Sequence, residues 1–201
     1  MESVRALPYP TLVQAVSPKA GEGIRLAEAV AMSVFIGLCA QIQVFLPGTP
    51  VPLTGQTLAV LLSGALLGSR WGAAAVVAYL MEGSLGMPFF AGGAFGAAHL
   101  VGPSGGYLLG FLPAAWLTGR LAQRGWDRTP VKAAAMMALG SLVILACGTA
   151  GLSRFVPAGG LLAAGVLPFL PGDAVKIVLA ASALPFGWSV LGRFGSPSKG
   201  R

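Results

Sequence analysis

Charged residues are scarce in this sequence. Only 9% of its 201 residues are charged, against roughly 25% in a typical soluble domain, while 55% are hydrophobic. The mean hydropathy is +0.79. This balance excludes a water-soluble globule and a disordered chain, and it is typical of a compact membrane protein that crosses the bilayer several times.

Residue types that carry chemistry are also scarce. The chain has one histidine, His99, and two cysteines, Cys39 and Cys147, each inside an apolar stretch that favours a packing role. We therefore expect no disulfide, no metal site and no bound cofactor. The motif G-x-x-x-x-G-K-[ST] does not occur either, so any use of ATP must come from partner subunits.

The apolar stretches predict an all-α integral membrane protein, a bundle of six transmembrane helices. The predicted spans are Ala27–Leu46, Thr57–Ser69, Trp71–Leu85, Gly106–Leu121, Val131–Gly151 and Pro171–Phe186. The second and third are short, and we expect Arg70–Trp71 to form the tight turn between them. The membrane domain then covers residues 27–190, between an N-terminal arm at 1–26 and a basic tail at 191–201.

The 13 basic residues indicate how these spans are oriented. All but Arg154 and Lys176 fall in the terminal segments or in connections on one side of the predicted membrane. The positive-inside rule therefore predicts a multi-pass protein of the cytoplasmic membrane with both termini cytoplasmic. The pI near 10.1 reflects this topology and not nucleic-acid binding, because no basic cluster with interleaved aromatic residues occurs.

The fourth connection is the most basic one. Its residues Arg120, Arg124 and Arg128 recur at four-residue intervals along what could be a helical extension. Two interpretations are open, namely attraction to anionic membrane lipid and a docking surface for a partner.

Two connections on the outer side are unusual. The first, residues 47–57, contains three prolines and no charge, which predicts a stiff extended segment. The second, residues 86–107, is long yet apolar and aromatic. We expect this second connection to fold back into the bundle as a re-entrant loop between helices 3 and 4, as a lid over a ligand pocket or as a structural plug.

The second connection also contains a formal G-x-S-x-G match at Gly102–Gly106, with His99 upstream of Ser104. An intramembrane serine protease would need this serine on a strand-to-helix turn and a histidine placed to take its proton. The match follows no predicted strand, and Pro103 separates His99 from the serine within one short loop. We therefore predict that the chain is not an enzyme and that His99 is a hydrogen-bonding residue of a pocket or loop.

The last predicted span opens with an unusual pair of charges. Pro171 suits the first turn of a helix, and Asp173 and Lys176, three residues apart, share a helix face. Ionisable residues at this depth mark a substrate or ion site by default, although an internal ion pair that fixes packing is the alternative. Glu82, near the outer end of the third span, either serves a proton or cation pathway or is a solvated helix end.

Five motifs together resemble the BioY family, the biotin-specific substrate-capture (S) components of energy-coupling factor (ECF) transporters. They are Pro50–Thr57, Leu67–Gly68, Gly86–Gly93, Gly102–Tyr107 and Pro168–Lys176. The resemblance runs from about Ala27 to Phe186, which is most of the chain. It implies a six-helix bundle that captures biotin from the outside of the membrane.

The resemblance also implies a binding site. Asp173 would accept hydrogen bonds from the ureido N–H groups of biotin, and Lys176 would bond an anionic or carbonyl oxygen. Some relatives carry an arginine where this chain has Ala94, so Lys176, His99 and Arg154 are alternative partners for the biotin carboxylate. The remaining candidates for the pocket, with the loop after the third span closing over the vitamin, are Gln56, Phe89, Phe90, Gly92, Gly93, Phe95, His99 and Tyr107.

The partners that the resemblance implies are an ECF coupling transmembrane subunit and two cytoplasmic ATPases. Small residues at four-residue intervals in the first span either contact that subunit or pack within the bundle. These residues are Ala27 and Ala31 in one series and Ala29, Ser33 and Gly37 in the other. Uptake by the chain alone or as a homo-oligomer, an S component for another small solute, and a secondary transporter with Glu82 or Asp173 as proton carrier are the alternatives.

Overall fold

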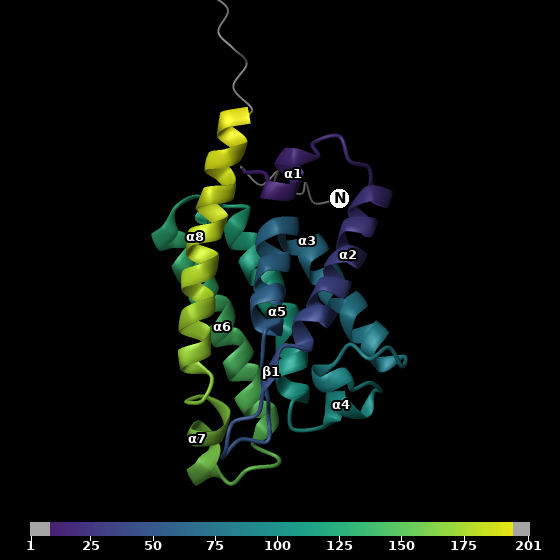
Figure 1. Cartoon of the computed structure of the whole chain (residues 1–201), viewed down its shortest axis with the longest axis vertical. Helices are drawn as coiled ribbons and strands as arrows, with labels where there is room; N and C mark the ends of the chain where they lie inside the picture. The colour runs from purple at the N-terminus through teal and green to yellow at the C-terminus, as the bar shows by residue number, and fades with distance from the viewer. Residues whose placement is uncertain (1–8, 195–201) are drawn as a thin grey trace, which may run out of the picture.

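The computed structural model describes residues 9–194, with side chains to residue 192, and it is mostly helical (Figure 1). Residues 1–8 of the predicted arm and 195–201 of the predicted tail lie outside the described residues. The α-helices are α1 (Leu12–Val16), α2 (Glu22–Ala40), α3 (Gln56–Ser84), α4 (Ala98–Val101), α5 (Gly105–Ala122), α6 (Pro130–Leu152), α7 (Leu161–Gly165) and α8 (Leu170–Phe194). Single turns of 3-10 helix, η1 (Ala91–Gly93), η2 (Trp126–Arg128) and η3 (Ala158–Gly160), lie in the connections.

Within residues 9–194, four helical stretches are long and apolar enough to cross a membrane. They are α2, α3, α6 and the stretch Ala158–Gly192 that includes α8. The predicted bounds hold to within about one residue for α5 and α6. The first span differs, because α2 begins at Glu22 and ends at Ala40, where the chain turns into a strand.

A short antiparallel hairpin departs from the all-α prediction. Strand β1 (Gln43–Val44) pairs with β2 (Leu53–Thr54), with Gln43 opposite Thr54 and Val44 opposite Leu53. The segment between them contains the three prolines, which lack the N–H that a longer ladder would need. The stiff connection predicted at residues 47–57 therefore contains β2, whereas β1 lies in residues that were predicted to belong to the first span.

Helix α3 is two antiparallel arms, and the chain reverses at Gly68. The backbone there has φ 86° and ψ 175°, a region that only glycine occupies without strain. In a straight helix Gln56 and Tyr79 would be about 35 Å apart, yet the Gln56 amide donates a hydrogen bond to the Tyr79 hydroxyl. The reversal thus lies at Gly68 and not at the predicted Arg70–Trp71, which belongs to the first turn of the second arm.

Small residues allow the arms of α3 and helices α5 and α6 to pack closely. A Cβ at Gly64 would collide with the Ala115 carbonyl of α5, and one at Gly119 would collide with the backbone at Ser69. Gly106 of α5 faces Gly151 of α6 in the same way. Glycine at each crossing brings the backbones together, as in other membrane bundles.

The two ends of the bundle differ in character. Figure 1 shows the start of the described chain, α1 and the last turns of α8 together at the top, which we call the terminal end. The β hairpin, α4 and α7 lie at the opposite end, which we call the loop end (Figure 1). The Gly68 reversal is at the terminal end, because Ser69 bonds Gln123 just after α5 and Arg70 pairs with Glu22 at 3.2 Å.

Candidate ligand-binding site

A cavity of about 290 Å³ lies at the loop end. Residues of the β hairpin, α4 and the loop before it, and the loop-end turns of α3, α5, α6 and α8 surround it. This volume is at the lower end of the range usual for small-molecule sites. The cavity is lined by Gln43, Phe45, Pro50, Val51, Pro52, Leu53, Thr54, Gln56, Thr57, Phe90, Ala91, His99, Gly102, Pro103, Ser104, Tyr107, Leu108, Phe111, Ile144, Leu145, Phe169, Asp173 and Lys176.

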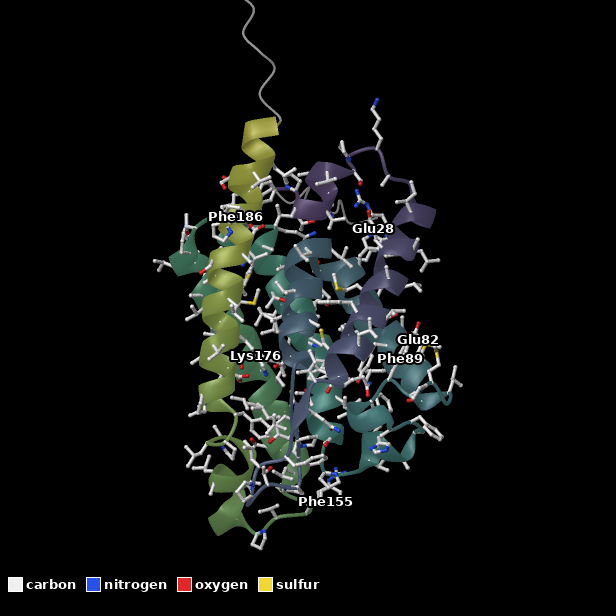
Figure 2. All side chains as sticks on the ribbon, in the orientation of Figure 1. Glu28, Glu82, Phe89, Phe155, Lys176 and Phe186 are labelled. Atoms are coloured by element: carbon white, nitrogen blue, oxygen red, sulfur yellow. The ribbon has the colours of Figure 1, made fainter. Side chains whose placement is uncertain are left out.

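One wall of the cavity carries the predicted pair of charges. Asp173 lies in the first turn of α8, and Lys176 follows one turn later with its Nζ 3.6 Å from Asp173 Oδ1. Lys176 Nζ also donates to Thr57 Oγ1 at 2.6 Å, and Ser141 Oγ donates to Asp173 Oδ2. Figure 2 shows Lys176 on α8 with its side chain directed into the bundle. Asp173 is 7% exposed, so a carboxyl and an amine are held together in the wall of a largely apolar site.

Phe90 forms an aromatic wall between the loop and α3. Its side chain is 2% exposed and makes edge contacts with Tyr79 and His99, each with ring centroids 5.7 Å apart. Gly83 leaves the space that the Phe90 ring fills, because a Cβ there would collide with it. This packing holds the loop against the second arm of α3 and places His99 at the cavity.

Tyr107 and Phe169 form a second aromatic wall, with ring centroids 5.5 Å apart. The Tyr107 ring lies directly over Gly148 of α6, where any side chain would collide with it. Its hydroxyl donates to the Gly165 carbonyl at 2.6 Å, which ties α5 to α7. The Tyr107 hydroxyl is therefore bonded within the protein, and the ring is what faces the cavity.

The predicted site residues divide into two groups. Asp173, Lys176, Gln56, Phe90, His99 and Tyr107 line the cavity. Phe89 instead lies over Gly37 of α2, Phe95 is 60% exposed, and Gly92 and Gly93 adopt positive φ of 70° and 72° in η1. Arg154, one alternative for the biotin carboxylate, is exposed and does not line the cavity.

Several residues at or next to the cavity were not predicted from the sequence. Gln43 and Phe45 come from the β hairpin, whose strands are too short to show an alternating pattern. Thr57 and Ser141 lie far from α8 in the sequence, and their types alone do not distinguish them from ordinary helix residues. The one available signal was Thr57 at the end of the Pro50–Thr57 motif.

Glu82 lies away from the cavity wall formed by α8. It accepts a hydrogen bond from Ser33 Oγ of α2 at 3.1 Å, and Figure 2 shows it beside Phe89 on the opposite side of the bundle from Lys176. Ser33 and Gly37 are buried in this contact between α2, α3 and the loop, whereas Ala27 and Ala31 are exposed. The small residues of α2 thus fall on two different faces.

The basic connection between α5 and α6 is folded onto the bundle. Gly125, with φ 80°, ends the helical path after α5, so the expected helical extension through Arg128 does not form. The Arg128 guanidinium lies over the Trp188 ring at 4.0 Å and the Tyr9 ring at 4.9 Å. Asp127 is fully buried and accepts a hydrogen bond from Trp188 Nε1 at 2.6 Å, and burial raises the pKa of its carboxyl.

Among the described residues, no group of three or more histidine, cysteine or acidic side chains is placed to hold a metal ion. The polar groups of the cavity are suited instead to an organic solute with both hydrogen-bond donors and acceptors.

Comparison with protein families decides the assignment. The BioY family model matches residues 15–193, which is nearly the whole described chain. The chain belongs to the BioY family. The resemblance found in the five sequence motifs is therefore confirmed.

Relatives in the BioY family are named as transporters. The chain is 41% identical to the "Biotin transporter BioY" of Rhodobacter capsulatus, over 72% of this chain and 86% of that protein. It is 36% identical to the "Probable biotin transporter BioY" of Pyrococcus horikoshii, over 78% and 93%. The match to the "Biotin transporter BioY" of Thermotoga maritima is 38% identical, over 68% and 80%.

A solved structure shares the BioY fold described here. It is a crystal structure of "the S-component for biotin from an ECF-type ABC transporter", with a TM-score of 0.73 and 26% sequence identity. The similarity covers 84% of this chain and 92% of that one. The chain thus has the fold of an ECF S component and relatives that are transporters, and it is not an enzyme.

Proposed function

We propose that this chain captures biotin from outside the cytoplasmic membrane and serves as the substrate-specific component of an ECF-type transporter. The observation that carries the proposal is the buried Asp173–Lys176 pair in the wall of an aromatic-lined cavity within a BioY-family fold. Biotin has two ureido N–H donors, a carbonyl acceptor, an apolar ring and chain, and a carboxylate. The cavity offers complementary groups for each part.

The ureido ring binds at the α8 wall. Asp173 accepts from a ureido N–H, and Lys176 donates to the ureido oxygen, while Thr57 and Ser141 hold the two charged groups. Gln56, Phe90 and Tyr107 enclose the ring and chain. Because Lys176 is assigned to the ureido oxygen, we assign the biotin carboxylate to His99, which lines the cavity from α4, across from α8 (Figure 1).

The segment between α3 and α5 is the lid that closes over the vitamin. Gln41 Nε2 donates to the carbonyls of Pro88 and Phe90, and the Gly96 N–H bonds the Gly83 carbonyl at 2.8 Å. Together with the buried Phe90 side chain, these bonds support an apolar loop that re-enters the bundle. The shape and the outer surface of this lid come from four further residues, Phe89, Gly92, Gly93 and Phe95.

The chain crosses the membrane six times, with both termini cytoplasmic. The spans are α2, the two arms of α3, α5, α6 and α8. The reversal at Gly68 supports counting α3 twice, and the proximity of the described chain ends supports an even number of crossings (Figure 1). The basic connections lie at the terminal end, which the positive-inside rule assigns to the cytoplasm.

Transport requires partners that supply ATP hydrolysis, namely a coupling transmembrane subunit and two ATPases. Ala27 and Ala31 remain available on the exposed face of α2 for contact with that subunit, whereas Ser33 and Gly37 pack within the chain. Uptake without these partners, by the chain alone or as a homo-oligomer, is the outcome to be distinguished by reconstitution.

The proposal is tested by titrating the purified protein with labelled biotin. We expect saturable binding at submicromolar concentration, displaced by unlabelled biotin and not by an unrelated vitamin such as thiamine. Absence of saturable binding would contradict the biotin assignment and favour another small solute. In proteoliposomes without partners, biotin accumulation driven by a proton gradient alone would instead indicate a secondary transporter.

A further inference from the structure

The two oxygens of the Asp173 carboxylate have different partners. Oδ1 lies 3.6 Å from Lys176 Nζ, whereas Oδ2 accepts a hydrogen bond from Ser141 Oγ of α6. Ser141 is 6% exposed, so this bond is shielded from solvent. Hydrogen bonds to an ionised group are among the strongest that a side chain makes, and they fix its orientation.

Ser141 lies behind Asp173 as seen from the main cavity. It does not line that cavity but lines a separate void of about 10 Å³. Asp173, Lys176 and Thr57 line both spaces, and the other walls of the void are apolar, formed by Leu58, Leu61, Met137 and Ile177. Ser141 therefore reaches a ligand in the cavity only through the Asp173 carboxylate.

We infer that Ser141 is a positioning residue for ligand binding, an inference that rests on the proposed binding of biotin in the cavity. Its hydroxyl donates a hydrogen bond to Asp173 Oδ2, and this bond keeps Oδ1 directed toward Lys176 and the ligand. Without this bond the Asp173 carboxylate rotates about its last torsion. Ordering the carboxylate when the ligand binds then lowers the affinity. Ser141 thus sets affinity without touching the ligand.

The test is a pair of variants with matched shape, Ser141→Thr and Ser141→Val, titrated with labelled biotin in detergent. Threonine keeps the hydroxyl and valine replaces it with a methyl group. We expect S141T to bind within about threefold of the wild type and S141V to bind about tenfold or more weakly. Equal affinities for the two variants would overturn the inference, because shape alone would then account for any loss.

A double-mutant cycle separates positioning from packing. In an Asp173→Ala background, which removes both carboxylate oxygens, we expect S141V to cost less than about twofold, because its effect acts through the Asp173 carboxylate. The same loss in both backgrounds would overturn the inference. Melting temperatures identify variants that fail to fold, and S141A then replaces S141V. If the wild type binds no biotin, the proposed function itself is refuted. If the wild type binds biotin and S141V binds it equally well, only the role of Ser141 is refuted.

Discussion

Lys176 Nζ lies 3.6 Å from Asp173 Oδ1, and the two residues stand one turn apart on the same face of α8. Both residues are largely buried, because 15% of the Lys176 side chain and 9% of the Asp173 side chain are exposed. An ion pair in this setting gains little net stability, because the cost of desolvating both charges offsets their attraction. This balance favours the proposed role of the pair in ligand binding over a role in packing alone.

Removing the Lys176 side chain tests whether the Asp173–Lys176 pair binds the ligand. We expect Lys176→Met to lower biotin affinity at least about tenfold and to lower the free energy of unfolding by about 3 kcal/mol, because it leaves a buried carboxylate without its counter-ion. The exposed Lys19→Met is the matched control and should change neither quantity. Isothermal titration and thermal unfolding in detergent measure both, and unchanged affinity in K176M would count against the assignment of the ureido site.

His99 should affect only the charged end of biotin. We expect His99→Ala to weaken the binding of biotin about tenfold and to leave the binding of biotinamide, which has a neutral tail, nearly unchanged. Arg154→Ala is the control, because Arg154 is exposed and does not line the cavity. If H99A weakened both ligands equally, or if R154A produced the selective loss, His99 would not be the partner of the carboxylate.

The lid offers a pair of phenylalanines with opposite environments. Phe90 is 2% exposed and packs on Tyr79 and His99, so Phe90→Ala should destabilise the protein by about 3–5 kcal/mol and weaken biotin binding. Phe95 is 60% exposed, and Phe95→Ala should change stability by less than about 0.5 kcal/mol. Dissociation rates of labelled biotin provide the second measurement, and a faster rate for F95A than for F90A would contradict this description of the lid.

The buried carboxyl of Asp127 should make the stability of the protein depend on pH. Burial raises the pKa of its carboxyl above the ordinary value of 3.8. A raised pKa in the folded state means that folding favours the protonated form, so stability falls as the pH rises through that pKa. We expect Asp127→Asn, which mimics the protonated form, to melt at a higher temperature than the wild type at pH 8, with the difference shrinking toward pH 4.

The exposed Glu22→Gln is the control for this measurement and should give no such convergence. A D127N variant less stable than the wild type at pH 8 would show that the attraction of Arg128 and the bond from Trp188 outweigh the cost of burying the charge.

Much of the fold was predictable from the sequence, because long apolar stretches fix α5 and α6 almost to the residue. The reversal within α3 was predicted at the wrong residues, because Arg70–Trp71 has the composition of a membrane interface. The decisive requirement is conformational, since φ 86° at residue 68 needs glycine. The β hairpin was missed because two-residue strands carry no periodic signal.

The candidate site was predictable where a residue is unusual for its surroundings. Asp173 and Lys176 stand out because they are charged within an apolar chain, and His99 because it is the single histidine. Ser141 and Thr57 do not stand out, since hydroxyl residues are common in membrane helices. Their importance comes from α3, α6 and α8 meeting at one point, which only the folded chain reveals.

A structure of the protein with biotin bound would test the proposed binding mode. We expect the ureido ring in the cavity, with one of its nitrogens about 3 Å from an Asp173 oxygen and its oxygen within hydrogen-bond distance of Lys176 Nζ. Biotin bound in the reverse orientation, with its carboxylate at Lys176, or bound outside the cavity, would contradict it.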